Sequence, residues 1–389
     1  MRPRSANIFA TVTFASIIFG VPIIQTTLEL REGERPQALE VFTQKPTVDN
    51  VRAYEAGLEE ASWAVKKLRP WMQYIQFVFL KEAGEKAIIG RDDWLFYRPA
   101  VEYATRRVVR HGGVSGPGDP LGAIVSFREQ LAAHGVQLLI LLAPNKVSIY
   151  PEMLSSQAQG TGSVVCPETR ELCQGLQAAG VEVVDLFTFF QEARPQGDKS
   201  GGQRLYLGQD SHWSPAGVEL AAEAVARRVL ERGWVSLGNV EFAETPVRLR
   251  RPGDLVRMLQ SPQIERHAGS EDIVCKQVVT REGGMPYQDA PDSEVLVLGD
   301  SFLRIYEQDE PGAAGFAAHL AKELKQPLAS IINDGGASTL VRQELYRRPQ
   351  LLTNKKLVIY EFVERDIRFG TEGWQIIPLP PTSAADDIE

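Results

Sequence analysis

Five short apolar runs rich in β-branched residues recur along the chain, and they constrain its fold more than any other feature. They are residues 136–142, 181–186, 294–298, 330–332 and 357–362. Stretches of helical character separate them, and Gly135 and Gly180 close the helices that precede the first two. Strands buried on both faces have this continuous apolar character. The pattern predicts an α/β protein with a doubly wound parallel sheet, whose ligands bind beyond the carboxyl ends of the strands.

The N-terminal segment predicts a membrane anchor. Arg2 and Arg4 precede residues 5–28, which carry no charge, and Glu29 ends the run. At ~1.5 Å per helical residue such a stretch just spans a hydrocarbon core of ~30 Å. The basic flank favours an N-terminus that stays inside and an exported remainder. No small-x-small cleavage pattern lies near residues 25–28, which favours an uncleaved signal anchor over a removed signal peptide.

The sequence divides into four parts. A signal anchor over 1–28 is followed by a juxtamembrane linker and helical region over 29–84, a large α/β domain over 85–378 and an acidic tail over 379–389. At 389 residues the chain is long enough for one large domain with an N-terminal appendage. Apolar residues within 51–83 recur at helical spacing and predict a packing face. These residues are Trp63, Leu68, Trp71, Ile75 and Phe77.

Charge and composition argue against two kinds of ligand. The net charge is -8 with a pI near 5.4, and no basic stripe is interleaved with aromatic residues, so we expect no nucleic acid partner. The five histidines are scattered, and no Cys-x-x-Cys or His-x-x-x-His spacing occurs, so we expect no metal and no cofactor. Cys166, Cys173 and Cys275 allow one disulfide plus a spare thiol in an oxidising compartment, and the pairing stays open.

A serine follows the third apolar run. Gly299, Asp300 and Ser301 come directly after that run and precede a stretch of helical character. A serine at such a strand-to-helix turn points into the ligand crevice, while its own amide faces a developing oxyanion. The alternative is ordinary helix capping, with glycine relieving the turn and the serine or aspartate capping the helix.

An Asp-x-His pair lies on a second loop. Asp210 and His212 precede Ser214 and Pro215, which are N-cap and first-turn signals for a helix running to about residue 231. One intervening residue lets the carboxylate reach the imidazole, fix its tautomer and stabilise the imidazolium. The alternative is a plain turn beside a packed histidine. Because Ser301 and His212 both fall at the carboxyl edge of the same predicted sheet, we interpret Ser301, His212 and Asp210 as a catalytic triad.

Several short motifs occur in a specific order between residues 85 and 366. They are GRDDWLFY (90–97), PNK (144–146) with IYP (149–151), DSHW (210–213), GDL (253–255), GDSF (299–302) and YEFVER (360–365). In this order they resemble the SGNH-hydrolase-like polysaccharide O-acetyltransferases of the AlgX/AlgJ type. Ordinary SGNH hydrolases have the serine block first and the histidine block last. Here Asp210 and His212 precede Ser301, which resembles the circularly permuted order of this family.

The resemblance implies a function. Residues 85–378 would be an SGNH-hydrolase-like catalytic domain that acetylates hydroxyls of an exported polysaccharide, alginate-like or another exopolysaccharide, through an acetyl-serine intermediate on Ser301. It implies a polysaccharide acceptor, a membrane-bound O-acyltransferase as acetyl donor partner, and a place at the periplasmic face of the cytoplasmic (inner) membrane. Two rival functions are an acetyl esterase with the same triad and a non-catalytic subunit of a polysaccharide assembly complex.

Oxyanion and substrate residues are less clear from the sequence. Gly335 or Gly336, after the fourth apolar run, is the expected backbone donor to the oxyanion, with Gly335 as the first choice. The position where the family resemblance expects an asparagine falls near Glu364 and Arg365. Tyr360 and Arg365 close the last run, where they would line the cleft and bind substrate. An ion pair with a neighbouring glutamate is the alternative reason for Arg365.

Overall fold

The computed structural model describes four stretches of the chain, residues 3–43, 45–105, 118–194 and 204–379. Contacts group the chain into two compact units, Met1–Ala83 with Gln260–His267 and Gly84–Leu259 with Ala268–Glu389. Residues 260–267, which the sequence analysis places in the large domain, therefore group with the N-terminal helices. The predicted acidic tail lies outside the described residues apart from Leu379.

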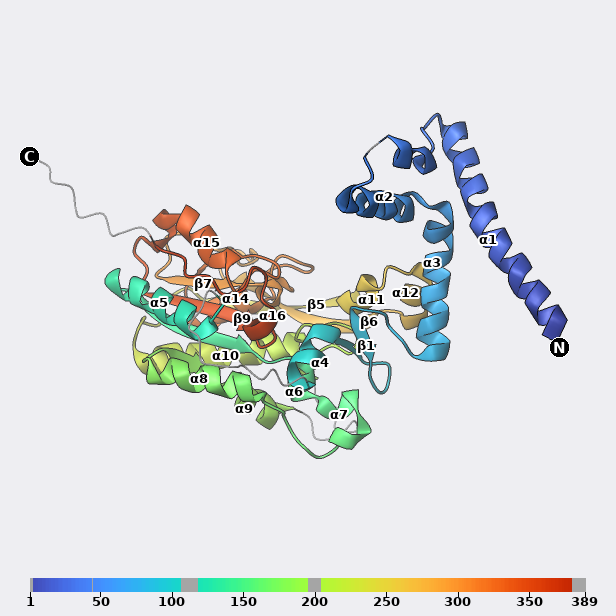
Figure 1. Ribbon diagram of the computed structural model, residues 1–389. Helices are drawn as coiled ribbons and strands as arrows, with labels where there is room; N and C mark the ends of the chain where they lie inside the picture. The colour runs from blue at the N-terminus through green and yellow to red at the C-terminus, as the bar shows by residue number, and fades with distance from the viewer. Residues whose placement is uncertain (1–2, 44, 106–117, 195–203, 380–389) are drawn as a thin grey trace, which may run out of the picture. The chain divides into compact units, whose positions relative to one another are not determined.

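The first unit is helical (Figure 1). Its elements are α1 (Pro3–Glu32), η1 (Gln37–Phe42), α2 (Val48–Ala61), α3 (Trp63–Ile75), the π-helical turn η2 (Gln76–Leu80) and α12 (Pro262–Ala268). Within α1, Ile8–Glu32 is long and apolar enough to cross a membrane, and the most apolar window is not buried in the protein. This helix fits the predicted anchor. The predicted helical region is also present, although the short η1 helix lies inside the segment expected to be a linker.

The predicted packing face of the helical region is largely wrong. Leu68, Trp71 and Ile75 are 57%, 53% and 44% exposed, so these side chains do not pack in a core. Phe77 does pack, since its ring lies 6.2 Å from the ring of His267 in α12. The helical spacing correctly indicated an amphipathic helix. It could not show whether the apolar face packs inside the protein or stays exposed on its surface.

The second unit is built on a five-stranded sheet in which every pairing is parallel, with the order β4-β3-β9-β7-β8. The strands are β3 (Gln137–Ala143), β4 (Glu182–Val184), β7 (Val295–Gly299), β8 (Ala329–Ile332) and β9 (Leu357–Val363). Each matches one predicted apolar run. The central β9 and β7 are buried at every position, as expected for strands covered on both faces. The doubly wound parallel sheet predicted from the sequence is confirmed.

Helices cover this sheet, and three of their ends lie at signals predicted from the sequence. The longer ones are α4 (Arg98–Thr105), α5 (Pro120–Ala133), α8 (Pro167–Ala178), α9 (Leu186–Ala193), α10 (Pro215–Arg232), α14 (Phe316–Leu324) and α15 (Leu340–Arg347). The short ones are α6 (Lys146–Ile149), α7 (Pro151–Leu154), η3 (Ser156–Ala158), α11 (Asp254–Met258), α13 (Ser301–Arg304), η4 (Pro349–Leu352) and α16 (Asp366–Phe369). Ser214 caps α10 by accepting from the amide of Gly217. Gly135 and Gly180 adopt the positive φ values of +73° and +74° that end the helices before β3 and β4.

Two antiparallel ribbons complete the unit. β1 (Ala87–Ile89) pairs with β2 (Leu95–Tyr97), and the ten-residue β5 (Phe242–Arg251) pairs with β6 (Glu271–Thr280). The second ribbon did not stand out in the sequence because its strands are partly exposed and contain as many polar as apolar residues. It nevertheless matters for the site, since Arg251 ends β5 and α11 follows directly.

Candidate active site

A tight turn presents Ser301 at the carboxyl end of β7. Asp300 accepts a hydrogen bond from the amide of Phe302 at 2.9 Å and so caps α13, whose first residue is Ser301. Only glycine fits before this turn, because a Cβ on Gly299 would overlap the carboxylate of Glu361. The strand end and the cap together fix the serine at the edge of the sheet where ligands bind.

The loop that carries His212 is packed onto the serine turn. The indole of Trp213 donates to the carbonyl of Phe302 at 3.0 Å, and the rings of His212 and Phe302 lie 5.0 Å apart. Tyr206 forms a β-bridge with Trp213 and closes the loop at its base. The hydrogen bond between Trp213 and Phe302 joins residues that are 89 positions apart in the sequence.

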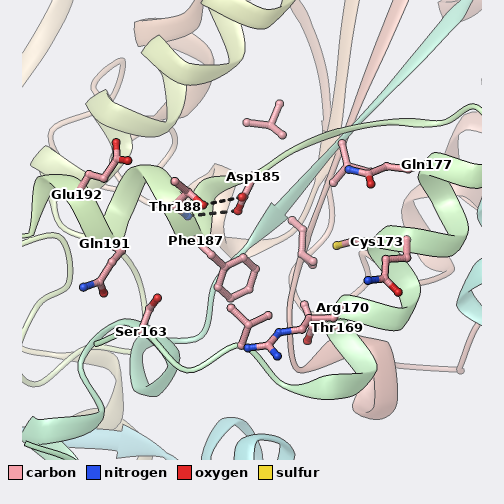
Figure 2. A pocket seen from close by; sticks show the side chains of 15 residues that line it. Ser163, Thr169, Arg170, Cys173, Gln177, Asp185, Phe187, Thr188, Gln191 and Glu192 are labelled. Carbon is pink, nitrogen blue, oxygen red and sulfur yellow. Dashed lines mark hydrogen bonds between the residues drawn. The ribbon is translucent and has the colours of Figure 1, made fainter. Parts of the chain in front are cut away.

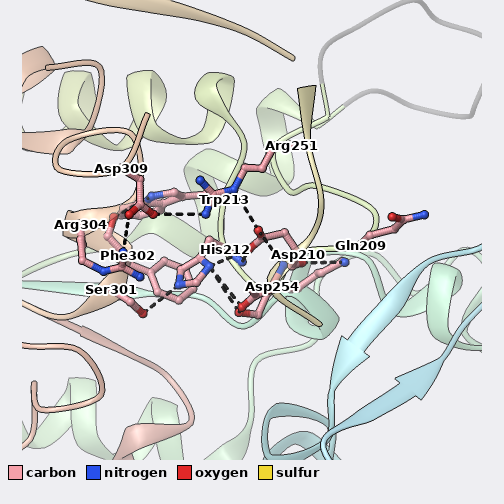
Figure 3. A network of polar contacts seen from close by, with 12 residues as sticks. Gln209, Asp210, His212, Trp213, Arg251, Asp254, Ser301, Phe302, Arg304 and Asp309 are labelled. Carbon is pink, nitrogen blue, oxygen red and sulfur yellow. Dashed lines mark hydrogen bonds and ion pairs between the residues drawn. The ribbon is translucent and has the colours of Figure 1, made fainter. Parts of the chain in front are cut away.

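The three predicted triad residues meet in hydrogen-bonding line (Figure 3). The Nε2 atom of His212 lies 2.8 Å from Oγ of Ser301, and its Nδ1 atom lies 2.7 Å from Oδ1 of Asp210. The backbone amide of His212 also donates to this Oδ1 at 3.0 Å. Asp210 is fully buried and His212 is 6% exposed. The arrangement allows the imidazole to take the serine proton while the carboxylate holds the tautomer.

Two further residues, which were not singled out as site residues, complete the network. Asp254, at the start of α11, has Oδ2 at 3.5 Å from Nδ1 of His212, and its carboxylate accepts from the amide and hydroxyl of Ser211 at 2.7 and 2.5 Å. The Nε of Arg251 lies 3.4 Å from the outer oxygen of Asp210. The imidazole therefore faces two carboxylates, and one guanidinium partly balances their charge.

Burial and charge shift the pKa values of this network in opposite directions. Burial lowers the pKa of His212, but the charge and hydrogen bond of Asp210 and the charge of Asp254 together outweigh burial, and the net pKa is raised. Burial raises the pKa of Asp210, but His212 and Arg251 outweigh it and hold the pKa well below its usual range. The pKa of Asp254 is raised by burial and by the neighbouring Asp210. Of the two carboxylic acids, Asp210 is thus the one that loses its proton at lower pH.

A buried lysine holds the loop from beneath. The Nζ of Lys146 donates to the carbonyls of Leu95, Gly208 and Asp210 at 2.7, 2.7 and 3.0 Å, and it lies 4.8 Å from the centre of the Trp94 ring. Burial lowers the pKa of Lys146 to about 7, an effect that nearby carboxylates oppose. Three carbonyl acceptors match the three donors of an ammonium group. Lys146 therefore explains the Pro-Asn-Lys motif as a support for the histidine loop.

Two backbone amides near the serine are free to donate. Among the described residues, the amides of Ser301 and Gly335 make no hydrogen bond, whereas that of Gly336 donates to the carbonyl of Asn333. The amide of Asn333 donates to the carbonyl of Gly299 at 3.0 Å, which ties the Gly335 loop to the serine turn. Gly335 has a φ of +65°, a conformation that favours glycine.

The remaining predicted site residues lie in different surroundings. Tyr360 is fully buried and its hydroxyl donates to the carbonyl of Ala337, so we do not propose that it contacts substrate. The side chain of Arg365 is 13% exposed and its guanidinium lies 5.0 and 5.7 Å from the ring centres of Tyr97 and Phe302. Its ion pair is not with a glutamate but with Asp366, at 3.9 Å.

Glu364 occupies the place where an oxyanion asparagine was expected. Its carboxylate is fully buried and accepts from the amide of Asn145 at 3.1 Å and from the hydroxyls of Ser148 and Thr169 at 2.5 and 2.9 Å. An acceptor saturated in this way cannot donate to an oxyanion. Glu364 instead joins α6 and α8 to the end of β9.

In the part of the chain that the structure describes, the group of histidine, cysteine and carboxylate ligands close enough to hold a metal ion includes two triad residues. Among the described residues, Asp210, His212 and Asp254 offer ligand atoms within 4.8 Å of one another. These atoms already bond to one another, to Ser211 and to Arg251. The triad network therefore accounts for the cluster, and the expectation of no metal stays a prediction.

A separate cavity of about 430 Å³ lies between α8 and α9 (Figure 2). Phe187 and Cys173 contribute to its apolar part, and Asp185 caps α9 through Thr188. Burial raises the pKa of the Cys173 thiol to about 11, so it is not a thiolate nucleophile at neutral pH. Cys166 and Cys275 are also free thiols, so the disulfide that the sequence allowed is not formed.

Fold and site together define the class of the protein. A serine after one parallel strand and an Asp-x-His pair from an earlier loop give an SGNH-hydrolase-like α/β protein with its blocks in permuted order. The chain belongs to the family described as SGNH hydrolase-like domain, acetyltransferase AlgX, which matches residues 87–364. It is accordingly an acyltransferase of the SGNH-like type.

Relatives with assigned names agree with this family. Probable alginate O-acetylase AlgJ of Azotobacter vinelandii is 27% identical over 327 residues, which cover 80% of this chain and 78% of the relative. The protein of the same name from Pseudomonas fluorescens is 26% identical over 310 residues, covering 77% and 72%. The solved O-acetyltransferase domain of Pseudomonas putida AlgJ has the same fold, with a TM-score of 0.55 and 21% identity over 72% of this chain and 92% of that structure.

Proposed function

We propose that this protein transfers acetyl groups to hydroxyls of an exported polysaccharide, with Ser301 as nucleophile, His212 as general base and acid, and Asp210 as the carboxylate behind it. The observation that carries the proposal is the distance of 2.8 Å between Nε2 of His212 and Oγ of Ser301, with Asp210 in line at Nδ1. The names of the relatives support an alginate-type polymer as acceptor.

The reaction takes two steps. His212 takes the proton of Ser301, whose oxygen attacks the carbonyl carbon of an acetyl donor, and the leaving group departs with the proton from the imidazolium. An acetyl-serine ester remains. His212 then takes a proton from a sugar hydroxyl, the sugar oxygen attacks the ester, and the same proton returns to Ser301 as the serine is released.

The negative charge of each tetrahedral intermediate needs donors. The amides of Ser301 and Gly335 support this role, because both are free among the described residues and lie on loops joined by a hydrogen bond. Arg365 lies over the ring of Phe302, next to the nucleophile, and would place a positive charge near the donor or acceptor. We therefore expect Arg365→Met to lose more activity than Arg365→Lys, which keeps the charge.

The donor and the location follow from the anchor. An anchored enzyme meets a membrane-bound O-acyltransferase, the donor partner implied by the family resemblance, at the bilayer. The basic flank of the anchor favours the periplasmic face of the inner membrane. The division into a signal anchor over 1–28, a helical region over 29–84 and a catalytic domain over 85–378 likewise stays a proposal.

The test uses an aryl acetate donor with the full-length protein. We expect mass spectrometry to find one acetyl group on Ser301 in the wild-type protein and none in Ser301→Ala, while the exposed Ser236→Ala control behaves as wild type. Adding oligosaccharides of different polymers should divert acetyl groups from water to sugar. Acetate release that no acceptor diverts would indicate an esterase, and unchanged polymer acetylation in cells carrying Ser301→Ala would indicate a non-catalytic subunit.

A further inference from the structure

One face of α3 and η2 is apolar and open. Its members recur three or four residues apart and are between 44% and 74% exposed. They are Leu68, Trp71, Met72, Ile75 and Phe79. We call these five residues the α3 stripe. Monomeric soluble proteins rarely expose a contiguous apolar surface of this kind unless it contacts a partner or a membrane.

The other face of α3 is already covered. The hydroxyl of Ser261 donates to the carbonyl of Pro70 at 2.9 Å. The ring of His267 packs edge-on against Tyr74 and Phe77 at 5.8 and 6.2 Å. These contacts fasten α12 to the positions that alternate with the α3 stripe along the helix. The stripe is therefore an additional surface and not the contact face of α12.

The segment that carries the stripe is one-sided in charge, although Arg69 lies 3.8 Å from the carboxylate of Glu59 in α2. Residues 62–81 contain Lys66, Lys67, Arg69 and Lys81 and no aspartate or glutamate, although the whole chain carries a net charge of -8. Basic residues beside an apolar, tryptophan-containing helix face are typical of helices that lie in the headgroup region of a bilayer. Anionic headgroups attract such a basic segment electrostatically.

The start of α3 is bonded to the C-terminal third of the candidate membrane span, Ile8–Glu32. The side chain of Gln25, in α1, donates to the carbonyl of Ala61 at 3.2 Å and accepts from the amide of Trp63 at 2.6 Å. Glu29, one turn further along α1, accepts from the amide of Gln37 at 3.2 Å. Gln25 and Glu29 lie near the C-terminal end of the apolar part of α1. A bilayer that holds the apolar part of α1 would therefore lie close to the start of α3.

We propose that the α3 stripe lies in the interfacial region of the phospholipid bilayer that α1 spans, with the flanking basic residues at anionic headgroups. The protein would then have a second membrane contact beyond its anchor. This inference needs α1 to be a membrane span, but it does not depend on the chemistry of Ser301.

Depth-resolved quenching tests the proposal in full-length protein reconstituted into nanodiscs of mixed zwitterionic and anionic phospholipid. Cys173, the least buried native thiol, is replaced by serine, and a fluorophore is attached at Met72→Cys or Phe79→Cys. Lipids carrying a nitroxide near the headgroup should quench both labels. A label at Phe14→Cys, in α1, is the positive control, read with lipids that carry the nitroxide deep in the acyl chain because position 14 lies near the middle of the uncharged run 5–28. A label at the exposed Glu55→Cys of α2 is the matched negative control. Replacing Lys66 and Lys67 by glutamate should reduce the quenching at position 72.

Each outcome decides the question. Quenching at positions 72 and 79, but not at 55, supports the proposal. Labels that lipid does not quench while position 14 is quenched overturn it, and aqueous iodide then identifies the alternative. Iodide access means that the stripe faces water, and protection from iodide means that protein covers it. An unquenched label at position 14 overturns the proposal as well, because the span it requires is missing.

Discussion

The Oδ2 atom of Asp254 lies 3.5 Å from the Nδ1 atom of His212, on the same side of the imidazole as Asp210 at 2.7 Å. Both carboxylates raise the pKa of His212. Asp254 also accepts two hydrogen bonds from Ser211, between the two triad residues. It therefore holds the loop as well as adding charge, and the two effects can be separated by experiment.

Asp254→Asn should move the pH profile of the acyl-transfer reaction. A general base acts when neutral, so activity rises with pH through the pKa of His212. Removing a charge that raises this pKa should shift the rising limb of kcat/KM to lower pH, with a loss of about tenfold at the plateau, smaller than the ~10²-fold or more for loss of the base itself. The exposed Asp272→Asn is the control. A reduced plateau with an unmoved limb would assign Asp254 a purely structural role.

Asp210→Asn should cost more activity than Asp254→Asn and should also change the acid stability. The amide presents the wrong partner to Nδ1, which in a comparable triad lowers kcat by ~10⁴. Because the folded pKa of Asp210 lies below its usual value, its stabilisation is present above about pH 4 and is lost as the pH falls through the folded pKa. Melting temperatures should therefore fall less steeply below about pH 4 in the variant. Parallel curves would contradict this assignment.

Lys146→Met should destabilise the protein and slow acyl transfer together. The substitution removes a donor from three carbonyls, of which that of Gly208 keeps the amide of Leu95 as a partner. A buried carbonyl left with no donor costs about 1–3 kcal/mol. One of them belongs to Asp210, so the loop should loosen and kcat should fall. Lys355→Met is a matched control, because this buried lysine donates to the carbonyl of Pro291 instead. Thermal melts and kcat should both change in the first variant, whereas an unchanged kcat would exclude a positioning role.

The sequence could predict the triad because its signals are local. The glycine turn before Ser301 and the Ser214-Pro215 cap after His212 each lie within three residues of the functional side chain. The five apolar runs then place both loops at one edge of the sheet. Sequence order alone thus identifies the residues that meet, although not the distances between them.

Asp254 and Arg251 could not be assigned in this way. They lie at the end of β5 and in the short helix after it, where a partly exposed strand of mixed polarity gives no apolar periodicity. Their contacts with Asp210 and His212 depend on where the ribbon lies in space. The prediction that Tyr360 lines the cleft has a different weakness. Because β9 is buried on both faces, the alternation of residues along the strand does not reveal which side chains reach the cleft.

Gly253→Ala should inactivate the enzyme through a steric contact next to the triad. A Cβ at position 253 would overlap the carbonyl of Gln209, the residue before Asp210. Its φ of -62° is ordinary, so the cost arises from the close approach and not from backbone strain. Relieving the overlap must move either the 209–212 loop or the start of α11, and both carry carboxylates that face His212. We expect a loss of at least ~10²-fold in kcat, because small displacements of catalytic groups have effects of this size.

Gly122→Ala is the control, since the new Cβ would lie 3.3 Å from the flexible side chain of Asp119. Wild-type kcat in Gly253→Ala would show that the loop tolerates displacement, and the close approach would then have no bearing on catalysis.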